Sequence, residues 1–185
     1  MPSSVLADIK DRMSKSTDAL THELSGIRTG RASATLFDAI KVDYYGTSTP
    51  LSQMATISVP EPRLITIQPW DISQLQAIEK AILTSDLGLT PSNDGKIIRV
   101  AIPQLTEERR KELVKLAKKY SEESKVSIRN IRREANERVN KLEKDKKISQ
   151  DENKKIHVEI QEITDKFTKK VDEILERKEA EIMEV

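Results

Sequence analysis

Three stretches of the chain place hydrophobic residues at three- and four-residue gaps, the spacing that gives an α-helix one apolar face. The first stretch has its apolar positions at Leu6, Ile9, Met13, Leu20, Leu24 and Ile27. Gly30 follows and predicts the helix end, because glycine readily adopts the left-handed conformation found after many helices. Gly26 lies inside this stretch, where glycine costs about 1 kcal/mol relative to alanine. It indicates either a close approach by a neighbouring helix or ligand, or fraying near the helix end.

The second and third stretches fill the C-terminal half. Thr106, followed by two glutamates, resembles a helix start. The apolar seam of this helix continues through Leu113, Leu116, Tyr120, Ile128, Ile131, Ala135, Val139 and Leu142. An unbroken helix to Lys147 would be about 60 Å long at about 1.5 Å per residue. Ser149 and Glu152 have the spacing of a capping box. They open a third helix with apolar positions at Ile156, Ile160, Ile163, Phe167, Val171 and Ile174. Three amphipathic helices predict a three-helix bundle.

The block between the first two helices has a different pattern. Ile40 to Tyr44 alternate between apolar and polar residues, as in a half-buried strand, and Gly46 offers a turn. Further strands are expected at Thr56 to Val59, Leu64 to Gln68 and Ile97 to Ile102. A short helix, capped by Ser73, is expected to carry Leu75, Ile78 and Ile82. The pattern predicts a small α/β domain.

Proline and charge mark the domain boundaries. Six of the seven prolines fall between residues 31 and 103, where only 13 of 73 residues are charged, against 42 of the 82 that follow. We therefore expect residues 1–30 and 105–185 to form the helical bundle and residues 31–104 to form an inserted domain. Two chain crossings must join them, and paired short linkers make a natural hinge. The expected hinge residues are Gly30, Arg31, Pro103, Gln104, Leu105 and Thr106.

Composition argues against several classes of protein. The absence of cysteine fits a reducing compartment, and no long apolar stretch or signal peptide is visible, so a cytoplasmic location without a membrane segment is expected. The only histidines, His22 and His157, belong to no recognisable metal-ligand spacing. Residues 88–96 lack the glycine spacing of a phosphate loop, and Ile97 stands where a serine or threonine would bind magnesium. No catalytic site, metal or cofactor is therefore expected.

Charge is distributed unevenly, although the formal net charge is only +1. Residues 125–147 hold nine Lys and Arg against four Asp and Glu, whereas residues 148–185 hold seven against eleven. A basic segment therefore lies beside an acidic one, and this distribution gives a reason to expect a nucleic-acid partner that the net charge does not give.

One face of the second helix is basic. At about 100° of rotation per residue, six residues fall within an arc roughly 100° wide, while Glu134 and Glu137 fall outside it. We call these six the basic arc: Lys125, Arg129, Arg132, Arg133, Asn136 and Asn140. Such a face can be a solvated flank whose arginine stems cover the edge of the core. The bias to arginine favours RNA, because guanidinium groups bind phosphate bidentately and stack on unpaired bases. Arg28 and Arg31 add two cations near the end of the first helix.

Six short motifs lie between residues 25 and 136. They are Ser25-Gly-Ile-Arg-Thr-Gly-Arg-Ala-Ser33, Val42-Asp-Tyr-Tyr-Gly46, Thr49-Pro-Leu51, Ser85-Asp-Leu-Gly-Leu89, Leu105-Thr-Glu-Glu-Arg-Arg-Lys111 and Ile128-Arg-Asn-Ile-Arg-Arg-Glu-Ala-Asn136. Each fragment alone is unspecific, but together, and in this order, they resemble the ribosome recycling factor family.

The resemblance implies an L-shaped α+β protein, a long three-helix bundle with an inserted small α/β domain, which mimics transfer RNA in outline. Members of the family bind the post-termination ribosome. With elongation factor G and GTP hydrolysis by that partner, they split the subunits, so that messenger and deacylated transfer RNA can leave. The chain is then expected to act as a monomer without enzymatic activity. Residues expected to bind large-subunit ribosomal RNA are Arg132 above all, with Arg129, Arg133, Arg28, Arg31, Asn130 and Lys125. The α/β domain would meet elongation factor G.

Two other classes of protein stay open. An adaptor protein could use its bundle to bind partner helices, with the basic arc serving only solubility. An enzyme is the least favoured class, because carboxylates are plentiful but nothing in the sequence selects a catalytic pair. Binding that is insensitive to salt and does not involve ribosomes would favour the adaptor.

Overall fold

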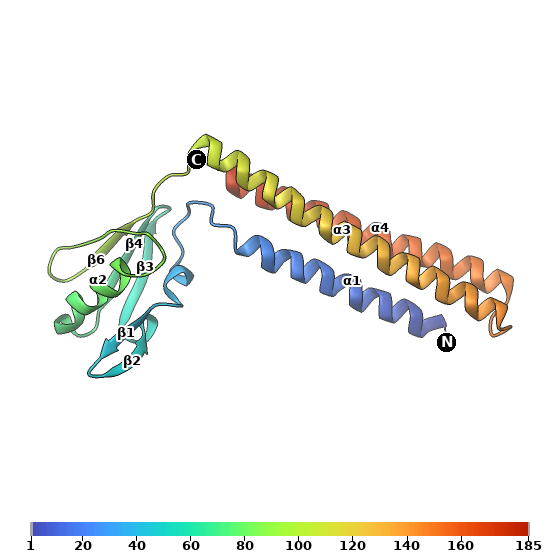
Figure 1. Ribbon diagram of the computed structural model, residues 1–185, viewed down its shortest axis with the longest axis horizontal. Helices are drawn as coiled ribbons and strands as arrows, with labels where there is room; N and C mark the ends of the chain where they lie inside the picture. The colour runs from blue at the N-terminus through green and yellow to red at the C-terminus, as the bar shows by residue number, and fades with distance from the viewer. Residues whose placement is uncertain (1, 185) are drawn as a thin grey trace. The chain divides into compact units, whose positions relative to one another are not determined.

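The computed structural model describes residues 2–184, and the chain divides into two compact units (Figure 1). The helical unit consists of Met1–Thr29 and Glu107–Val185, and the sheet unit consists of Gly30–Thr106. The junctions expected from the sequence, at residues 30/31 and 104/105, lie close to these bounds. The sheet unit is therefore an insertion between the first and second helices of the bundle.

The helical unit is a three-helix bundle, as predicted. Its helices are α1 (Pro2–Ser25), α3 (Glu107–Lys144) and α4 (Gln150–Met183). Each helix contacts the other two, and Figure 1 shows them side by side. With 38 residues, α3 is about 57 Å long at about 1.5 Å per residue. This length gives α3 a long flank that can carry a row of side chains.

The middle of the α3 seam differs from the prediction. Leu116 and Tyr120 are only half-buried, while Ala117, Ser121 and Ser124 are buried beside them. Small side chains allow α1 to approach closely here, and the Ser124 hydroxyl lies 3.3 Å from the hydroxyl of Ser16 on α1. In this part of α3, the close packing of small side chains, rather than hydrophobic character, therefore determines which residues are buried.

The first helix ends earlier than predicted. It stops at Ser25 rather than near Gly30, and the backbone N–H of Gly26 donates to the carbonyl of Glu23 in a tight final turn. A Cβ atom at Gly26 would meet only that carbonyl, at 3.3 Å. Of the alternatives for Gly26, the close approach of a neighbouring helix is therefore excluded, and Gly26 lies in the tight turn that ends the helix.

The turn between α3 and α4 also begins before the predicted position. Helix α3 ends at Lys144, and Lys146 adopts a left-handed conformation with φ of 59°. The backbone N–H of Lys147 donates to the carbonyl of Leu142, and that of Lys146 donates to Glu143, both at 2.9 Å. This is the Schellman pattern, which satisfies the last carbonyls of a helix without glycine at the left-handed position.

The capping box that opens α4 is confirmed. The Ser149 hydroxyl accepts from the backbone N–H of Glu152 at 3.2 Å, and the Glu152 carboxylate accepts from the backbone N–H of Ser149 at 2.8 Å. The second hydrogen bond lowers the pKa of Glu152, because it stabilises the carboxylate. The interaction fixes where α4 begins.

Removing this cap should destabilise the helical unit. We expect Ser149→Ala to cost about 1 kcal/mol, because one N–H of the first turn loses its acceptor. The Tm should fall by about 4 °C for a unit of this size, as measured by circular dichroism at 222 nm. Ser127→Ala, at an exposed position inside α3, is the matched control and should not lower the Tm. Equal melting temperatures for both variants would contradict the cap's contribution.

The sheet unit contains the predicted strands and helix and further elements that the pattern did not reveal. The strands are β1 (Lys41–Tyr44), β2 (Thr47–Pro50), β3 (Ala55–Glu61), β4 (Leu64–Pro69), β5 (Pro91–Asn93) and β6 (Ile98–Ala101). Helix α2 (Leu75–Leu83) is joined by the short 3-10 helices η1 (Ala34–Phe37), η2 (Leu51–Gln53) and η3 (Ile72–Gln74). The unpredicted β2 and β5 have no hydrophobic alternation, and each contains proline.

One face of the antiparallel sheet β3-β4-β6-β5 is buried. The cross-strand pairs Ile65 with Val100 and Ile67 with Ile98 lie on it, and all four side chains are fully buried. Helix α2 contributes to the same core, while β1 and β2 pair as a separate hairpin. The alternation in β4 and β6 was a reliable guide, because one face of each strand meets the core.

The start of α2 corrects the expected cap. Asp71, rather than Ser73, is the capping residue, and it caps η3 instead of α2 itself. One oxygen of the Asp71 carboxylate accepts both from the backbone N–H of Ser73, at 3.0 Å, and from its hydroxyl, at 2.7 Å. A charged acceptor forms the stronger hydrogen bond, so the serine becomes a donor.

Candidate nucleic-acid interface

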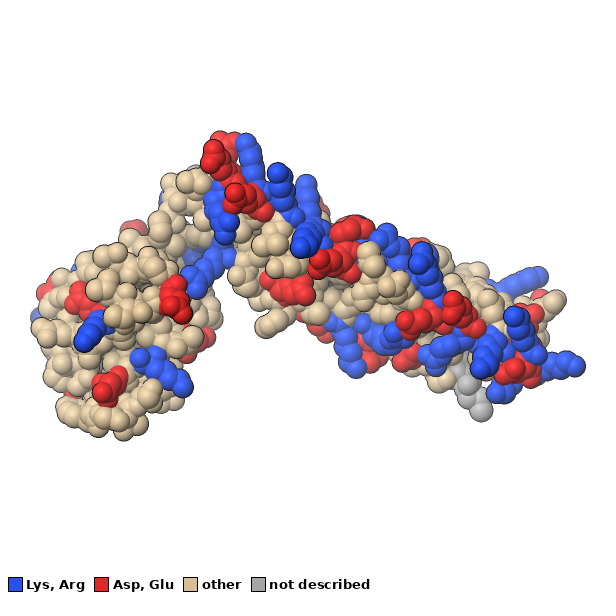
Figure 2. All heavy atoms as spheres, viewed as in Figure 1, with Lys and Arg blue, Asp and Glu red and all other residues tan. Residues whose placement is uncertain are grey.

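The basic arc lies on the flank of α3 that contacts α4. Lys125 is half-buried there, and its Nζ lies 2.6 Å from the carboxylate of Asp172 on α4. Arg132 is also half-buried, whereas Arg129 and Arg133 are exposed. Figure 2 shows Lys and Arg interspersed with Asp and Glu along the helical unit. Whether a cation can bind a ligand therefore depends on the side chain that it already contacts.

The arginines of the arc differ in their partners. Arg129 forms an ion pair with Glu122, which lies two turns earlier on α3, at 3.1 Å. Arg132 reaches across to α4 and donates to the side-chain oxygen of Gln161 at 3.5 Å. Its acceptor is neutral, so the charge of Arg132 is not balanced by this contact. The side chain is oriented but keeps the charge that a phosphate would require.

The two asparagines of the arc serve the contact between helices. The ring of His157 on α4 lies between them, with Nδ1 2.7 Å from the side-chain oxygen of Asn136 and Nε2 2.9 Å from that of Asn140. The side-chain amide of Asn153 donates to the same oxygen of Asn140 at 3.2 Å. Partners on α4 therefore hold the side chains of both asparagines.

His157 is thus a structural residue of the α3–α4 contact. Within residues 2–184, no group of three or more His, Cys, Asp or Glu side chains could hold a metal ion. The same part of the chain contains no helix with the length and apolar character needed to cross a membrane.

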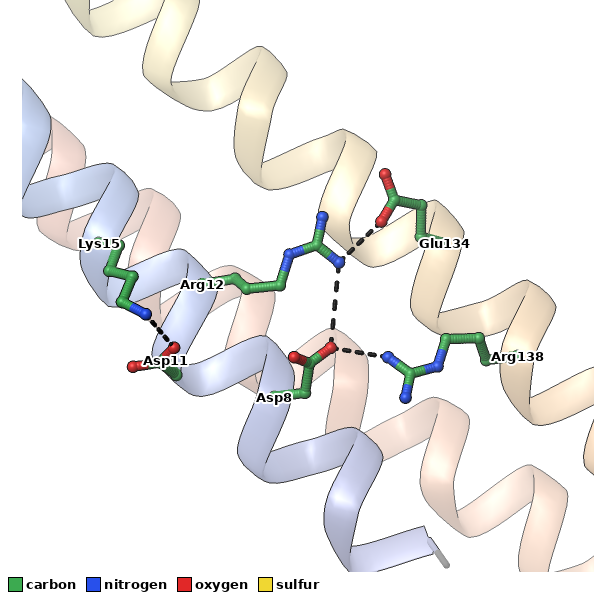
Figure 3. Close-up of polar contacts among 6 residues, drawn as sticks. All are labelled: Asp8, Asp11, Arg12, Lys15, Glu134 and Arg138. Atoms are coloured by element: carbon green, nitrogen blue, oxygen red, sulfur yellow. Dashed lines mark hydrogen bonds and ion pairs between the residues drawn. The ribbon is translucent and has the colours of Figure 1, made fainter.

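The opposite flank of α3 faces α1 and carries its own charge network (Figure 3). Arg12 pairs with Glu134 at 2.7 Å, and Asp8 accepts from Arg138 at 2.7 Å. The hydrogen bond to Glu134 raises the pKa of the Arg12 guanidinium. Glu134 lies outside the basic arc, as its helical position predicts, and is engaged by α1. The arc is therefore kept free of this carboxylate.

Arg28 does not join the basic arc. Helix α1 runs antiparallel to α3, because Arg12 contacts Glu134 and Ser16 contacts Ser124. From the Ser16–Ser124 contact, Arg28 lies 12 residues in one direction and Arg132 lies 8 residues in the other. At about 1.5 Å per residue, the separation along the bundle is about 30 Å. Arg28 is exposed, and the neighbouring Thr29 hydroxyl donates to Glu181 on α4 at 3.0 Å.

The hinge segments lie close together where they belong to the sheet unit. Gly30 has a φ of +76°, and a Cβ atom there would meet the side chain of Leu105 at 3.2 Å. The backbone N–H of Ala32 donates to the carbonyl of Pro62 at 2.7 Å, and that of Ile102 donates to Arg63 at 2.8 Å. Both segments are thus tied to the turn between β3 and β4. Arg31 is exposed and belongs to this unit.

Several residues of this surface could not be predicted. Gln161 and Asp172 contact arc residues from α4, and Glu122 pairs with Arg129 from within α3. Their only sequence signal was a polar position on an amphipathic helix. Which of these positions lie beside the arc depends on the register between α3 and α4, and that register becomes visible only in the structure.

The fold and the surface together define a class: a helical binding protein with an arginine-bearing bundle and an inserted α+β unit. Residues 20–183 match the family described as ribosome recycling factor. The chain belongs to the ribosome recycling factor family. It is 57% identical to the ribosome-recycling factor of Oleidesulfovibrio alaskensis over 182 residues, covering 98% of this chain and 99% of the relative. It is likewise 57% identical to that of Brevibacillus brevis over the full length of both.

Solved structures give the same result. The solution structure of a ribosome recycling factor matches with a TM-score of 0.74 and 44% identity, over 100% of this chain and 98% of the other. A second match, with a TM-score of 0.62 and 49% identity over 100% of both chains, is the T. thermophilus ribosome recycling factor. That structure represents it and E. coli elongation factor G bound to the E. coli post-termination complex.

Proposed function

We propose that this chain binds the post-termination ribosome and splits its subunits together with elongation factor G, so that messenger and deacylated transfer RNA can leave. The observation that carries the proposal is identity of 57% with ribosome-recycling factors over nearly the entire chain. A relative represented with elongation factor G on the post-termination complex supports the choice of partners. The chain acts in the cytoplasm as a monomer and is not itself an enzyme, since GTP hydrolysis belongs to elongation factor G.

The basic arc is the proposed contact with large-subunit ribosomal RNA. Arg132 is the central residue, and its support is a half-buried, oriented guanidinium with an uncompensated charge. The residues proposed to assist it on α3 are Arg129, Arg133, Asn130 and Lys125. Because Arg28 is about 30 Å away along the bundle, it forms a second point of contact. Arg31, on the sheet unit, is assigned to the RNA as well.

The sheet unit is the proposed receiver of elongation factor G. Its two connections to the bundle, Gly30-Arg31 and residues 103–106, form the hinge, and support comes from their closeness at Gly30 and Leu105. The bundle then anchors the chain on RNA while the sheet unit transmits the movement driven by GTP hydrolysis. A hinge of this kind needs only a few residues that absorb backbone rotation.

Cosedimentation with purified large ribosomal subunits across a salt series tests this function. Binding should weaken with salt, with a slope of log affinity against log salt of about −5 if all of the proposed cations displace counterions from phosphates. Light scattering should show subunit splitting only when the chain, elongation factor G and GTP are all present. Salt-insensitive binding without ribosome association would instead support the adaptor class and contradict the proposal.

A further inference from the structure

Two consecutive hydrogen bonds connect Arg132 to side chains on α4. Its guanidinium donates to the side-chain oxygen of Gln161 at 3.5 Å, and the side-chain nitrogen of Gln161 donates to the carboxylate of Asp165 at 2.7 Å. The shorter hydrogen bond determines the orientation of the amide, because its nitrogen must face the carboxylate. The oxygen of Gln161 is therefore presented to Arg132.

The neutral partner distinguishes Arg132 from three other cations on α3. Lys125 pairs with Asp172, Arg129 pairs with Glu122, and Arg138 pairs with Asp8. A cation that leaves a carboxylate to bind phosphate must first break an ion pair, so part of the gain is lost. Arg132 avoids this loss, because an amide oxygen orients the guanidinium without compensating its charge.

We infer that Gln161 is a positioning residue for Arg132, which holds the guanidinium for an RNA phosphate or base while an amide spacer keeps the Asp165 carboxylate at a distance. This inference rests on the proposed function, because it assigns a supporting residue to the proposed RNA contact. Gln161 itself need not touch RNA. Its effect is to select one orientation of a long, flexible side chain before binding, which reduces the entropy lost in the complex.

Exchange of the neutral amide for a carboxylate of the same shape tests whether Arg132 requires an uncharged acceptor. In Gln161→Glu, the new carboxylate is repelled by Asp165 and turns toward the guanidinium of Arg132. There it forms an ion pair with Arg132. We expect affinity for purified large subunits to fall about tenfold, and the salt slope to become shallower by about 1, because one cation no longer displaces a counterion. Helical circular dichroism should be unchanged, since glutamate and glutamine have similar helix propensities.

The matched control adds a carboxylate near Gln161 on α4 at a position with no recorded contact to Arg132. Val158 lies one turn before Gln161 on α4 and is 58% exposed, so Val158→Glu introduces a solvated carboxylate. It should weaken binding no more than about twofold, because charges in water are strongly screened. An equal loss in both variants would mean that general repulsion of RNA explains the effect, and would overturn the role of Gln161.

A double-mutant comparison separates this inference from the function on which it rests. In an Arg132→Ala background, Gln161→Glu should have almost no further effect on affinity, because its target is gone. Tenfold weakening that persists in this background, or wild-type binding by Gln161→Glu alone, would overturn the positioning role. If Arg132→Ala itself binds normally, the proposed RNA contact fails first.

Discussion

Replacing Arg132 by alanine is expected to lower the affinity for large ribosomal subunits about 10- to 100-fold while the helical circular dichroism stays unchanged. The physical reason is the loss of a charge-assisted hydrogen bond to phosphate or of a stacked guanidinium, worth about 1.5–3 kcal/mol. The fold should survive, because the structure gives Arg132 only a long hydrogen bond to an exposed glutamine. Cosedimentation at fixed salt measures the loss of affinity, and splitting activity should fall in parallel.

Arg138→Ala is the matched control for the loss of one positive charge from α3. Arg138 lies on the flank that faces α1 and pairs with Asp8 at 2.7 Å, with half of its side chain exposed. Its replacement should change the affinity less than about threefold, since a paired charge away from the arc contributes mainly long-range attraction. Normal binding and splitting by Arg132→Ala would remove this residue from the proposed RNA contact. Equal losses in both variants would show that only total charge matters.

The sequence predicted the regular parts of the fold because repeated burial produces a repeated pattern. The seams of α1, α3 and α4 and the alternation in β4 and β6 all follow from one face meeting a core. The Ser149 capping box was equally readable, since both of its hydrogen bonds lie within four consecutive residues. The strand β5, which begins with Pro91, lacks such a pattern and was missed.

Local competition explains the errors at the ends of helices. Gly30 has the left-handed conformation expected of a helix stop, but α1 ends at Ser25, and Gly30 instead serves a close approach to Leu105. Asp71 displaces Ser73 as a cap because its carboxylate is the better acceptor. Both alternatives were chemically possible in the sequence, and surrounding contacts decide between them.

The candidate site likewise combines features that the sequence predicts with features that it does not. The angular position of Arg132 on α3 follows from helical geometry and could be calculated from the sequence. Its partner Gln161 could not, since 29 residues separate the two and their contact depends on the register of two packed helices. For the same reason the contact of Asn136 with His157, at 2.7 Å, could not be predicted. Sequence identified the cations, and packing reveals which of them keep their charge available.

A core deletion in the sheet unit is expected to have the largest effect on stability. Ile67 is fully buried and pairs with Ile57 on β3 and Ile98 on β6. Truncation to alanine leaves a cavity in a packed core and costs about 2–5 kcal/mol. A unit of 77 residues, Gly30–Thr106, has a stability on the order of 4–12 kcal/mol, so this loss is a large fraction of the total. Amide hydrogen exchange in the sheet unit should accelerate by about 30- to 5,000-fold, the factors that correspond to about 2 and 5 kcal/mol.

The helical unit should remain folded in the Ile67→Ala variant. The buried cluster that contains Ile67 extends from Phe37 to Val100 and is built entirely from the sheet unit. Amide exchange in α1, α3 and α4 should therefore stay at the wild-type rate. Val59→Ala, at a position on β3 that is 41% exposed, is the control and should change neither unit by more than about 0.5 kcal/mol. Equal acceleration in both units would contradict their independence.

If the bundle anchors the chain on RNA and the sheet unit receives the movement from elongation factor G, RNA binding and subunit splitting should depend on different units. At a temperature where the sheet unit of Ile67→Ala is largely unfolded, cosedimentation with large subunits should persist, because the basic arc belongs to α3. Splitting with elongation factor G and GTP should be lost, since an unfolded unit cannot transmit force to the bundle. Loss of binding in proportion to splitting would show that the sheet unit, rather than the bundle, carries most of the RNA contact, and would contradict the assignment of anchoring to the bundle.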